Sequence, residues 1–321
     1  MAASAFSRGT YPQFGDPANI PGPPGMRPSV ARLRRASSSI WQSNGLLIRR
    51  FGVRVPGGPP QDLPGRFRSV SFTVDADAYD RFMGRYSSPL APQFADFAGV
   101  AAGYRVLDVG CGPGALTTEL VSRLGPNTVS AVDPSEPFVA AVRERLPGVS
   151  AQRASAEELP FEDRAFDATL AQLVVHFMAN PVAGLGEMAR VTREDGVVAA
   201  CVWDHAGSLG PLSVFWRAAR ELDPDVEDES QRAGAREGDL GQLLQEAGLH
   251  EIEEGALSVS VGHESFEEWW EPFTLGVGPA GGFTTALDAT RQAQLRERCR
   301  QMLPAAPFVI TAGAWVARGL V

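Results

Sequence analysis

Short apolar segments alternate with segments of helical periodicity from residue 104 onward. In the second kind, apolar residues recur every three to four positions, as they do on one face of a helix. Strands that alternate with helices of this length predict a doubly wound α/β fold, with a mostly parallel sheet covered on both faces. The expected strands are 104–110, 128–133, 166–175 and 196–203, and the expected helices are 114–125, 136–148, 180–192 and 239–249. The helix over 180–192 is expected to have Asn180 as its N-cap and Pro181 at its first helical position.

The pattern changes in the last third of the chain. Alternating apolar and polar residues predict strands over 249–262 and 307–319, whereas 265–278 and 289–303 have helical periodicity. We therefore expect a helical insertion at about 263–306, before the last strand. An insertion of this size beside a cleft is typically a lid or a substrate wall.

Residues 1–70 have a different composition. They are rich in Gly, Pro, Ser and Arg and show no sustained periodicity. This composition predicts a disordered extension, with the folded domain at 71–321. Part of the extension is rich in Arg and Ser and lacks acids, as transit peptides do, so a targeting role is the alternative to a non-functional extension.

Charge is unevenly distributed along the chain. All 29 basic residues are Arg, and the net charge is −9. Residues 1–70 contain ten Arg and two acids, a charge of +8, so the remainder carries −17. An acidic body of this size argues against nucleic acid as the main partner.

The cysteines and the apolar segments indicate the cellular setting. Cys111, Cys201 and Cys299 are odd in number and far apart, which fits neither a disulfide framework nor a metal site. We therefore expect a reducing, cytoplasmic location and no bound metal. No apolar run approaches the roughly 18–20 residues that cross a bilayer, so no membrane span is expected.

The segment 106–117 reads VLDVGCGPGALT, with glycines at 110, 112 and 114 at the end of an expected strand. Glycines in this pattern indicate that a ligand lies close to the backbone. Gly110, Gly112 and Ala115 also fit the dinucleotide pattern G-x-G-x-x-A, and Asp133 follows at a distance suited to a ribose. On spacing alone, NAD remains an alternative.

Asp108 distinguishes an anionic dinucleotide from a cationic ligand. A carboxylate at this position repels a pyrophosphate but attracts a ligand that carries an ammonium and a sulfonium group. Two unit charges about 4 Å apart interact by about 4 kcal/mol at an effective dielectric constant of 20, so the sign of the ligand charge is decisive. Further along, Ser155, Ala156 and Glu157 follow a short strand and could frame a flat adenine.

Together, VLDVGCGPG, AVDPSEPFV, AEELPFEDRAFD and the strand that ends at Gln172 resemble the class I S-adenosylmethionine-dependent methyltransferases. The resemblance is greatest to small-molecule enzymes of the ubiquinone/menaquinone-methyltransferase-like type and covers about 76–205. It implies a Rossmann-like, mostly parallel sheet of seven strands with an antiparallel edge strand. It also implies S-adenosyl-L-methionine as cofactor and a small-molecule methyl acceptor, and it allows for a homodimer.

The resemblance assigns roles to individual residues. Gly110, Gly112 and Gly114 approach the methionine part of the cofactor, and Asp108 helps to hold that end. Asp133, which precedes Pro134, accepts the ribose hydroxyls, since two carboxylate oxygens suit a vicinal diol. Further cofactor contacts are implied for Pro134 beside Asp133, for Phe138, Ser155, Ala156 and Glu157 at the adenine, for Gln172 near the sulfonium, and for Tyr79 and Arg85 at the carboxylate end.

The expected reaction is transfer of a methyl group to an O, N or C atom. His176 and His205, near the ends of two expected strands, are candidates for a general base, which is needed only if the acceptor loses a proton. The alternatives are an NAD(P)-dependent oxidoreductase and a non-catalytic cofactor-binding or regulatory protein of the same fold. The absence of Lys excludes a Tyr-x-x-x-Lys pair, which disfavours the oxidoreductase.

Overall fold

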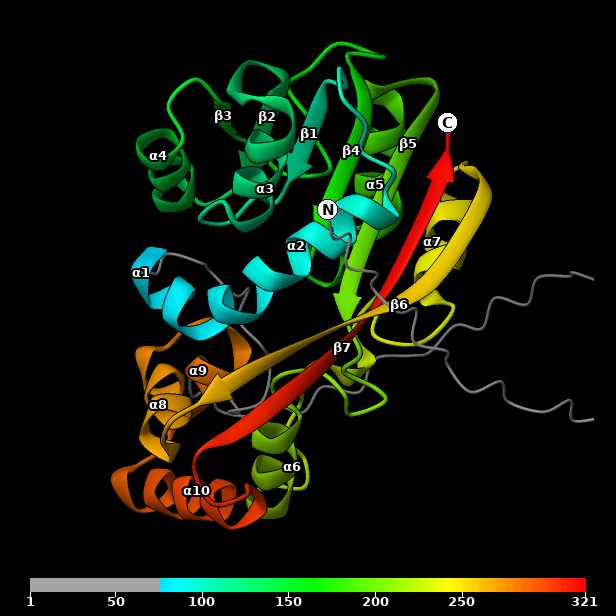
Figure 1. The fold of residues 1–321 in the computed structure, drawn as a ribbon. Helices are drawn as coiled ribbons and strands as arrows, with labels where there is room; N and C mark the ends of the chain where they lie inside the picture. Colours follow the sequence, from blue (N-terminus) through cyan, green and yellow to red (C-terminus); the bar gives the residue numbers. More distant parts are fainter. Residues whose placement is uncertain (1–75) are drawn as a thin grey trace, which may run out of the picture. The chain divides into compact units, whose positions relative to one another are not determined.

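Seven strands form one sheet in the order β3-β2-β1-β4-β5-β7-β6. A computed structural model describes residues 76–321, and the extension expected at 1–70 lies outside them. Figure 1 shows the arrangement of the strands. Their bounds are β1 Val106–Val109, β2 Val129–Asp133, β3 Ser150–Arg153, β4 Phe166–Gln172, β5 Thr192–Trp203, β6 His250–His263 and β7 Phe308–Leu320.

The first five strands are parallel and β7 is antiparallel to both of its neighbours. Strand order reverses between β1 and β4, so the carboxyl ends of these two strands flank a topological switch point, where open α/β sheets bind their ligands. The mostly parallel, seven-stranded sheet is confirmed. The antiparallel strand, expected at the edge, is β7, which lies second from the edge because β6 pairs with its outer side.

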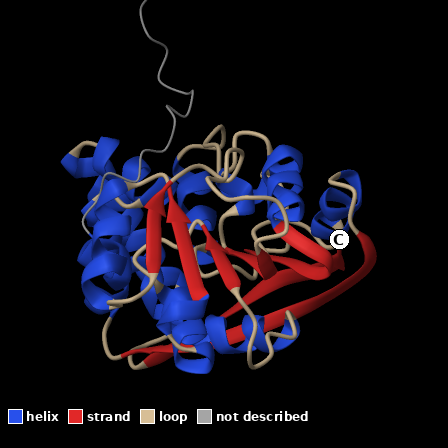
Figure 2. Cartoon of the chain, turned by 90° about the horizontal axis from the view of Figure 1, so that it is seen from above, coloured by secondary structure: helices blue, strands red, loops and turns tan. Residues whose placement is uncertain are grey.

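Helices cover both faces of the sheet, as Figure 2 shows. Side chains of α2, α3 and α4 belong to one apolar core, and those of α5 and α7 belong to the other. Strand β1 contributes Val106 to the first core and Leu107 to the second, as alternation along a doubly covered strand requires. The helices are α2 Arg85–Phe97, α3 Ala115–Leu124, α4 Glu136–Arg145, α5 Pro181–Val191 and α7 Asp239–Glu246.

The start of α5 illustrates how local sequence sets these boundaries. Pro181 occupies the first turn, and the Asn180 side chain accepts the backbone N–H of Ala183 at 3.1 Å. This is the expected N-cap, since Asn satisfies an N–H group that has no partner within the helix.

A group of helices lies between β6 and β7 in the sequence and packs with α6 (Ser213–Leu222) at one end of the long β6–β7 ribbon (Figure 1). Trp269 and Trp270 are buried there, and the Phe273 ring stacks on Phe215 with centroids 4.6 Å apart. The segment expected as one helix over 265–278 is two, because Pro272 lies where a second turn would continue. The members are α8 Phe266–Trp270, the 3₁₀ helix Glu271–Leu275, α9 Gly278–Ala286 and α10 Ala289–Met302.

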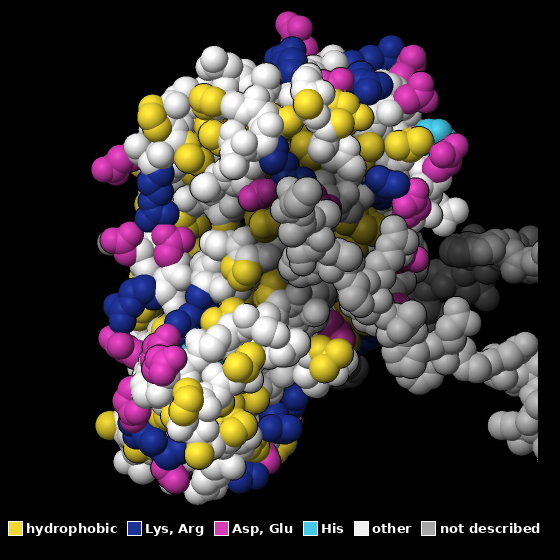
Figure 3. Space-filling model, viewed as in Figure 1, with side chains coloured by type: hydrophobic (Ala, Val, Ile, Leu, Met, Phe, Trp, Pro, Cys, Tyr) yellow, Lys and Arg dark blue, Asp and Glu magenta, His cyan; other side chains and the backbone are white. Residues whose placement is uncertain are grey.

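The described chain begins with α1 (Ala76–Tyr79) and a π-helix (Asp80–Gly84), which lead into α2. Arg145 of α4 pairs with Asp77 and Asp80 of this segment. Figure 3 shows that acidic and basic side chains are intermixed on the visible face, without a separate basic patch among the described residues there. Within 76–321, no helix has the length and apolar character needed to span a bilayer.

Candidate functional site

The turn after β1 has a backbone that only glycine adopts without strain. Gly110, Gly112 and Gly114 have φ angles of 71°, 52° and 102°. A Cβ atom on Gly110 would lie 2.1 Å from Cγ2 of Val174, so the turn is also closely packed. The N–H group of Gly110 donates to the carbonyl of Val132 at 2.8 Å, which fixes the turn against the end of β2.

Asp133, the last residue of β2, organises the same turn. Its Oδ2 accepts the N–H of Gly112 at 2.9 Å, and its Oδ1 accepts the N–H of Ser135 at 2.8 Å. The side chain is buried, and burial raises the pKa of the carboxyl above its usual value. Each carboxylate oxygen can accept more than one hydrogen bond, so both can still accept a ligand hydroxyl.

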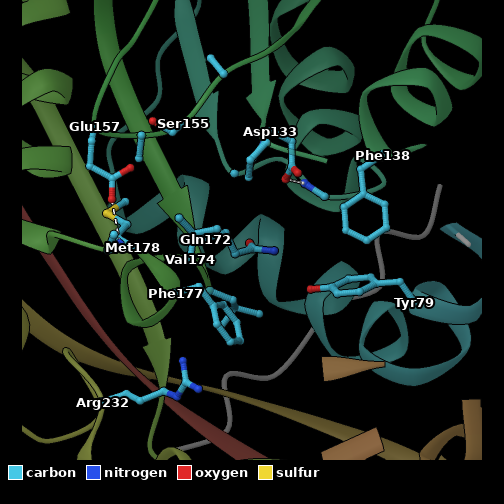
Figure 4. Close-up of a pocket in the computed structure, with 17 residues that line it drawn as sticks. Tyr79, Asp133, Phe138, Ser155, Glu157, Gln172, Val174, Phe177, Met178 and Arg232 are labelled. Carbon is cyan, nitrogen blue, oxygen red and sulfur yellow. Dashed lines mark hydrogen bonds between the residues drawn. The ribbon is translucent and has the colours of Figure 1, made fainter. Parts of the chain in front are cut away.

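A cavity of about 520 Å³ opens beside the turn, at the carboxyl ends of β1, β2 and β4. Figure 4 shows Tyr79 and Phe138 at one side, Asp133 between them and Glu157, and Gln172 near the centre. Ten of the residues expected to bind the cofactor line this cavity, namely Tyr79, Gly110, Gly112, Asp133, Pro134, Phe138, Ser155, Ala156, Glu157 and Gln172.

Two aromatic rings shape one side of the cavity. The rings of Tyr79 and Phe138 meet edge to face, with centroids 5.2 Å apart. At the other side, Oε1 of Glu157 accepts the N–H groups of Ala179 and Asn180 at 2.8 and 3.2 Å. Glu157 thus holds the loop that precedes α5 as well as lining the cavity.

Asp108 lies behind the glycine turn and is fully buried. Its Oδ2 accepts the Thr117 hydroxyl at 2.6 Å, whereas its Oδ1 has no hydrogen-bond partner among the described residues. Burial raises the pKa of this carboxyl to about 7. The side chain lines a small cavity whose wall also includes Gly110, Gly112 and Gln172, so it adjoins the large cavity without lining it. Gly114 caps the start of α3, and it lines neither cavity.

The structure places Arg85 away from the cavity, contrary to the role that the resemblance implies. Arg85 begins α2, beyond the π-helix that separates it from Tyr79, and its guanidinium forms an ion pair with Glu268 of α8. It also donates to Nδ1 of His263 at 3.1 Å. With a carboxylate and an imidazole as partners, the guanidinium joins α2 to the helices after β6.

His176 and His205 follow the carboxyl ends of β4 and β5, with ring centroids 5.5 Å apart. They line a second, smaller cavity that shares Tyr79, Leu173 and Phe177 with the large one. Burial lowers the pKa of both imidazoles, that of His205 to about 4. Both rings are therefore neutral near pH 7.

Several lining residues were not expected from the sequence. Phe177 and Met178 follow β4 closely, and their place beyond a parallel strand is a signal that could have identified them. Arg232 comes from the loop before α7, where nothing in the local sequence indicates a ligand contact. The full set is Ala154, Leu173, Val174, Phe177, Met178, Ala179 and Arg232.

Part of the chain is similar in sequence to known methyltransferases. Residues 107–200 match the family model described as a methyltransferase domain. An uncharacterized methyltransferase of Mycobacterium tuberculosis is 40% identical over 139 residues, which cover 43% of this chain and 54% of that protein. A rice chloroplastic 2-methyl-6-phytyl-1,4-hydroquinone methyltransferase is 35% identical over 115 residues, 35% of this chain and 31% of that protein. The chain thus spans about half the length, or less, of these relatives.

Among solved structures, a chain of the complex between the Haloferax volcanii Trm112 methyltransferase activator and a methyltransferase has the same fold. It has a TM-score of 0.50 at 17% identity and covers 76% of this chain and 94% of that chain. The ubiquinone/menaquinone-like subtype remains a prediction. Residues 107–200 thus match a methyltransferase domain, within a chain whose seven-stranded sheet has the fold of a solved methyltransferase complex chain.

Proposed function

We propose that the chain transfers the methyl group of S-adenosyl-L-methionine to a small-molecule acceptor. One observation carries this proposal. The carboxylate of Asp133, at the end of β2, is hydrogen-bonded to the glycine turn and lies at the wall of a cavity of about 520 Å³. This arrangement offers a diol acceptor, a backbone that a ligand can approach closely, and aromatic surface in one concave site.

The residues present fit this cofactor. Asp133 would accept the ribose hydroxyls, and the apolar edge of Phe138 would pack on the adenine, with Ser155 and Ala156 along its rim. The methionine end would lie against Gly110 and Gly112, in front of the buried Asp108. The unpartnered Oδ1 of Asp108 supports a cationic ligand, because a nearby positive charge favours the ionised carboxyl.

When bound, the sulfonium compound supplies an electrophilic methyl group. The chain's own residues then have to align the acceptor with that methyl group and exclude water. Holding two reactants at about 3–3.5 Å is worth roughly 7–11 kcal/mol relative to their encounter in solution. The buried ends of β4 and β5, with Leu173, Phe177 and Trp203, supply apolar surface for this purpose.

The nature of the acceptor atom, the cytoplasmic location and a homodimer remain predictions from the sequence. The same applies to the role of the helices after β6 as a lid or substrate wall. Their part in the second cavity, through Val277, Gly278 and Pro279, supports that role.

The direct test is incubation of the full chain with S-adenosyl-L-methionine and a panel of small O, N and C nucleophiles, with S-adenosylhomocysteine as the measured product. We expect acceptor-dependent product formation. Binding of S-adenosylhomocysteine without turnover on any acceptor class would favour the non-catalytic protein of the same fold.

A further inference from the structure

The second cavity lies where β4 and β5 end, under the start of α9. Its own volume is small, about 30 Å³. It is lined by Tyr79, Phe82, Met83, Leu173, His176, Phe177, Trp203, His205, Leu212, Glu229, Val277, Gly278 and Pro279. It adjoins the 520 Å³ cavity, because Tyr79, Leu173 and Phe177 line both.

Three buried polar atoms in this wall have no hydrogen-bond partner among the described residues. They are Nδ1 of His176, Nε1 of Trp203 and Nε2 of His205. The His176 and Trp203 side chains are 7% and 2% exposed. Buried polar groups in proteins are almost always hydrogen-bonded. Three unpartnered atoms around one cavity therefore indicate that a ligand forms hydrogen bonds with them.

The polar wall carries little charge. Burial keeps both imidazoles neutral near pH 7, and it raises the pKa of Glu229 to about 7. Glu229 is already engaged, since its Oε2 accepts the indole N–H of Trp216 at 2.6 Å. Arg232 donates to the His176 carbonyl at 3.2 Å and lies over the Phe177 ring, and its charge lowers the pKa of both imidazoles. Since the Glu229 carboxyl and the guanidinium are already hydrogen-bonded, a neutral ligand group suits this buried wall better than an ionised one, which would lose its hydration.

A hydroxyl group fits the unpartnered atoms. The indole N–H of Trp203 can only donate, whereas a neutral imidazole has one nitrogen that accepts. One hydroxyl group can accept the indole N–H through its oxygen and donate its own O–H to an imidazole nitrogen at the same time. The cavity has room for this group alone, so the rest of the acceptor lies against the rings of Tyr79 and Phe177, which face both cavities. Aromatic walls favour a flat, apolar body.

We propose that this cavity binds the hydroxyl of an uncharged, phenol-like acceptor and that His176 takes the proton as the methyl group is transferred. This inference rests on the methyl transfer proposed above. His176 is the choice over His205 because it adjoins Phe177, which borders the large cavity, with ring centroids 3.9 Å apart.

The step balances in atoms and charge. A bond forms between the hydroxyl oxygen and the methyl carbon, and the bond between that carbon and sulfur breaks with its electron pair left on sulfur. The hydroxyl proton moves to the imidazole. The positive charge passes from sulfur to His176, so the buried site keeps the same net charge throughout.

Binding to the full chain saturated with S-adenosylhomocysteine tests the class of acceptor, with phenol, benzoate and benzylammonium as probes of equal ring size. Ligand-observed NMR gives their relative affinities. We expect phenol to bind at least tenfold more tightly than either charged probe. Equal or tighter binding of benzoate or benzylammonium would overturn the proposal.

Variants test the assigned residues. Trp203→Phe keeps an aromatic side chain, although a smaller one, and removes the N–H donor, and we expect phenol affinity to fall at least fivefold. His176→Asn should lower kcat for conversion of phenol to anisole by a hundredfold or more, since general-base catalysis typically contributes 10²–10⁴. His250→Gln, on the exposed start of β6, is the matched control and should change neither.

Affinity for S-adenosylhomocysteine distinguishes failure of this inference from failure of the proposed function. Suppose that wild type and all variants bind S-adenosylhomocysteine within twofold of one another. If Trp203→Phe then has the phenol affinity of wild type and His176→Asn has its kcat for phenol, only this inference is wrong. If the wild-type chain does not bind S-adenosylhomocysteine at all, the proposed function itself fails.

Discussion

Oδ2 of Asp133 accepts the backbone N–H of Gly112 at 2.9 Å, so the end of β2 fixes the turn that follows β1. The two residues are 21 positions apart in the sequence, and they meet because β1 and β2 are parallel neighbours in the sheet. A single carboxylate thereby serves two purposes in the proposed site: it holds the glycine turn in place and presents its remaining lone pairs to the cavity.

Replacing Asp133 should therefore weaken cofactor binding. In Asp133→Asn, the charge is lost and one oxygen becomes an N–H₂ group that faces the N–H of Gly112 or Ser135. We expect affinity for S-adenosylhomocysteine to fall by about 1–3 kcal/mol, the usual contribution of charge-assisted hydrogen bonds, as measured by calorimetric titration. Asp225→Asn, on an exposed loop, is the control. Unchanged affinity in Asp133→Asn would contradict the ribose assignment.

Gly110 and Gly103 form a matched pair for testing the turn. Both have positive φ angles, of 71° and 89°, but a Cβ atom would meet Val174 at Gly110 and nothing within 4 Å at Gly103. We expect Gly103→Ala to cost about 1–2 kcal/mol of stability through backbone strain alone. Gly110→Ala should lower the melting temperature further and abolish cofactor binding, because the turn must move. Equal behaviour of the two variants would show that close packing at Gly110 is unimportant.

Asp108 should destabilise the unliganded protein in a pH-dependent way. Burial raises its pKa from an ordinary value of 3.8 to about 7. The unfolded chain therefore releases this proton at lower pH than the folded chain does, and stability is lost as the pH rises from about 4 to about 7. We expect Asp108→Asn to be more stable than wild type at pH 8, by on the order of 4 kcal/mol at most.

Urea denaturation at several pH values measures this difference. The difference in stability should shrink as the pH falls through 7 and vanish below about 4, where the carboxyl is protonated in both the folded and the unfolded chain. A difference that does not change with pH would mean that the Asp108 carboxyl does not titrate in this range. The same variant should bind S-adenosyl-L-methionine more weakly than wild type, since the cation loses its nearest buried carboxylate.

Arg85 should matter for stability and not for cofactor binding. Its ion pair with Glu268 is partly buried and joins α2 to α8, whereas the Arg81–Glu271 pair is exposed on both sides. We expect Arg85→Gln to lower the melting temperature by a few degrees and to leave the dissociation constant for S-adenosylhomocysteine within twofold of wild type. Arg81→Gln should change neither quantity, as is usual for exposed pairs. A tenfold loss of affinity in Arg85→Gln would restore its role at the cofactor.

Local sequence was sufficient to predict much of the fold. Apolar runs located the parallel strands β1, β2, β4 and β5, and Asn180 with Pro181 predicted the start of α5. Helix α9 (Gly278–Ala286) was not expected, because its glycines and threonines favour helix poorly and its stability comes from packing. Helix α6 was not expected either, although its buried Phe215, Trp216 and Ala219 follow a helical period that the sequence displays.

The site was predictable only where residues lie close to the glycine turn or to a strand end. Gly110 and Asp133 belong to local patterns whose geometry follows from the βα unit. Arg232 reaches the cavity from a distant loop, and Arg85 finds its partner 183 residues away, so both depend on tertiary contacts. No periodicity or spacing along the chain records such contacts.

The most direct test of the account is a calorimetric titration of the full chain with S-adenosylhomocysteine and, in parallel, with NADH. A cavity with carboxylates at its turn should bind the sulfur nucleoside saturably, at one molecule per chain, and should give no measurable heat with the anionic dinucleotide. Saturable binding of NADH together with no binding of S-adenosylhomocysteine would contradict the account.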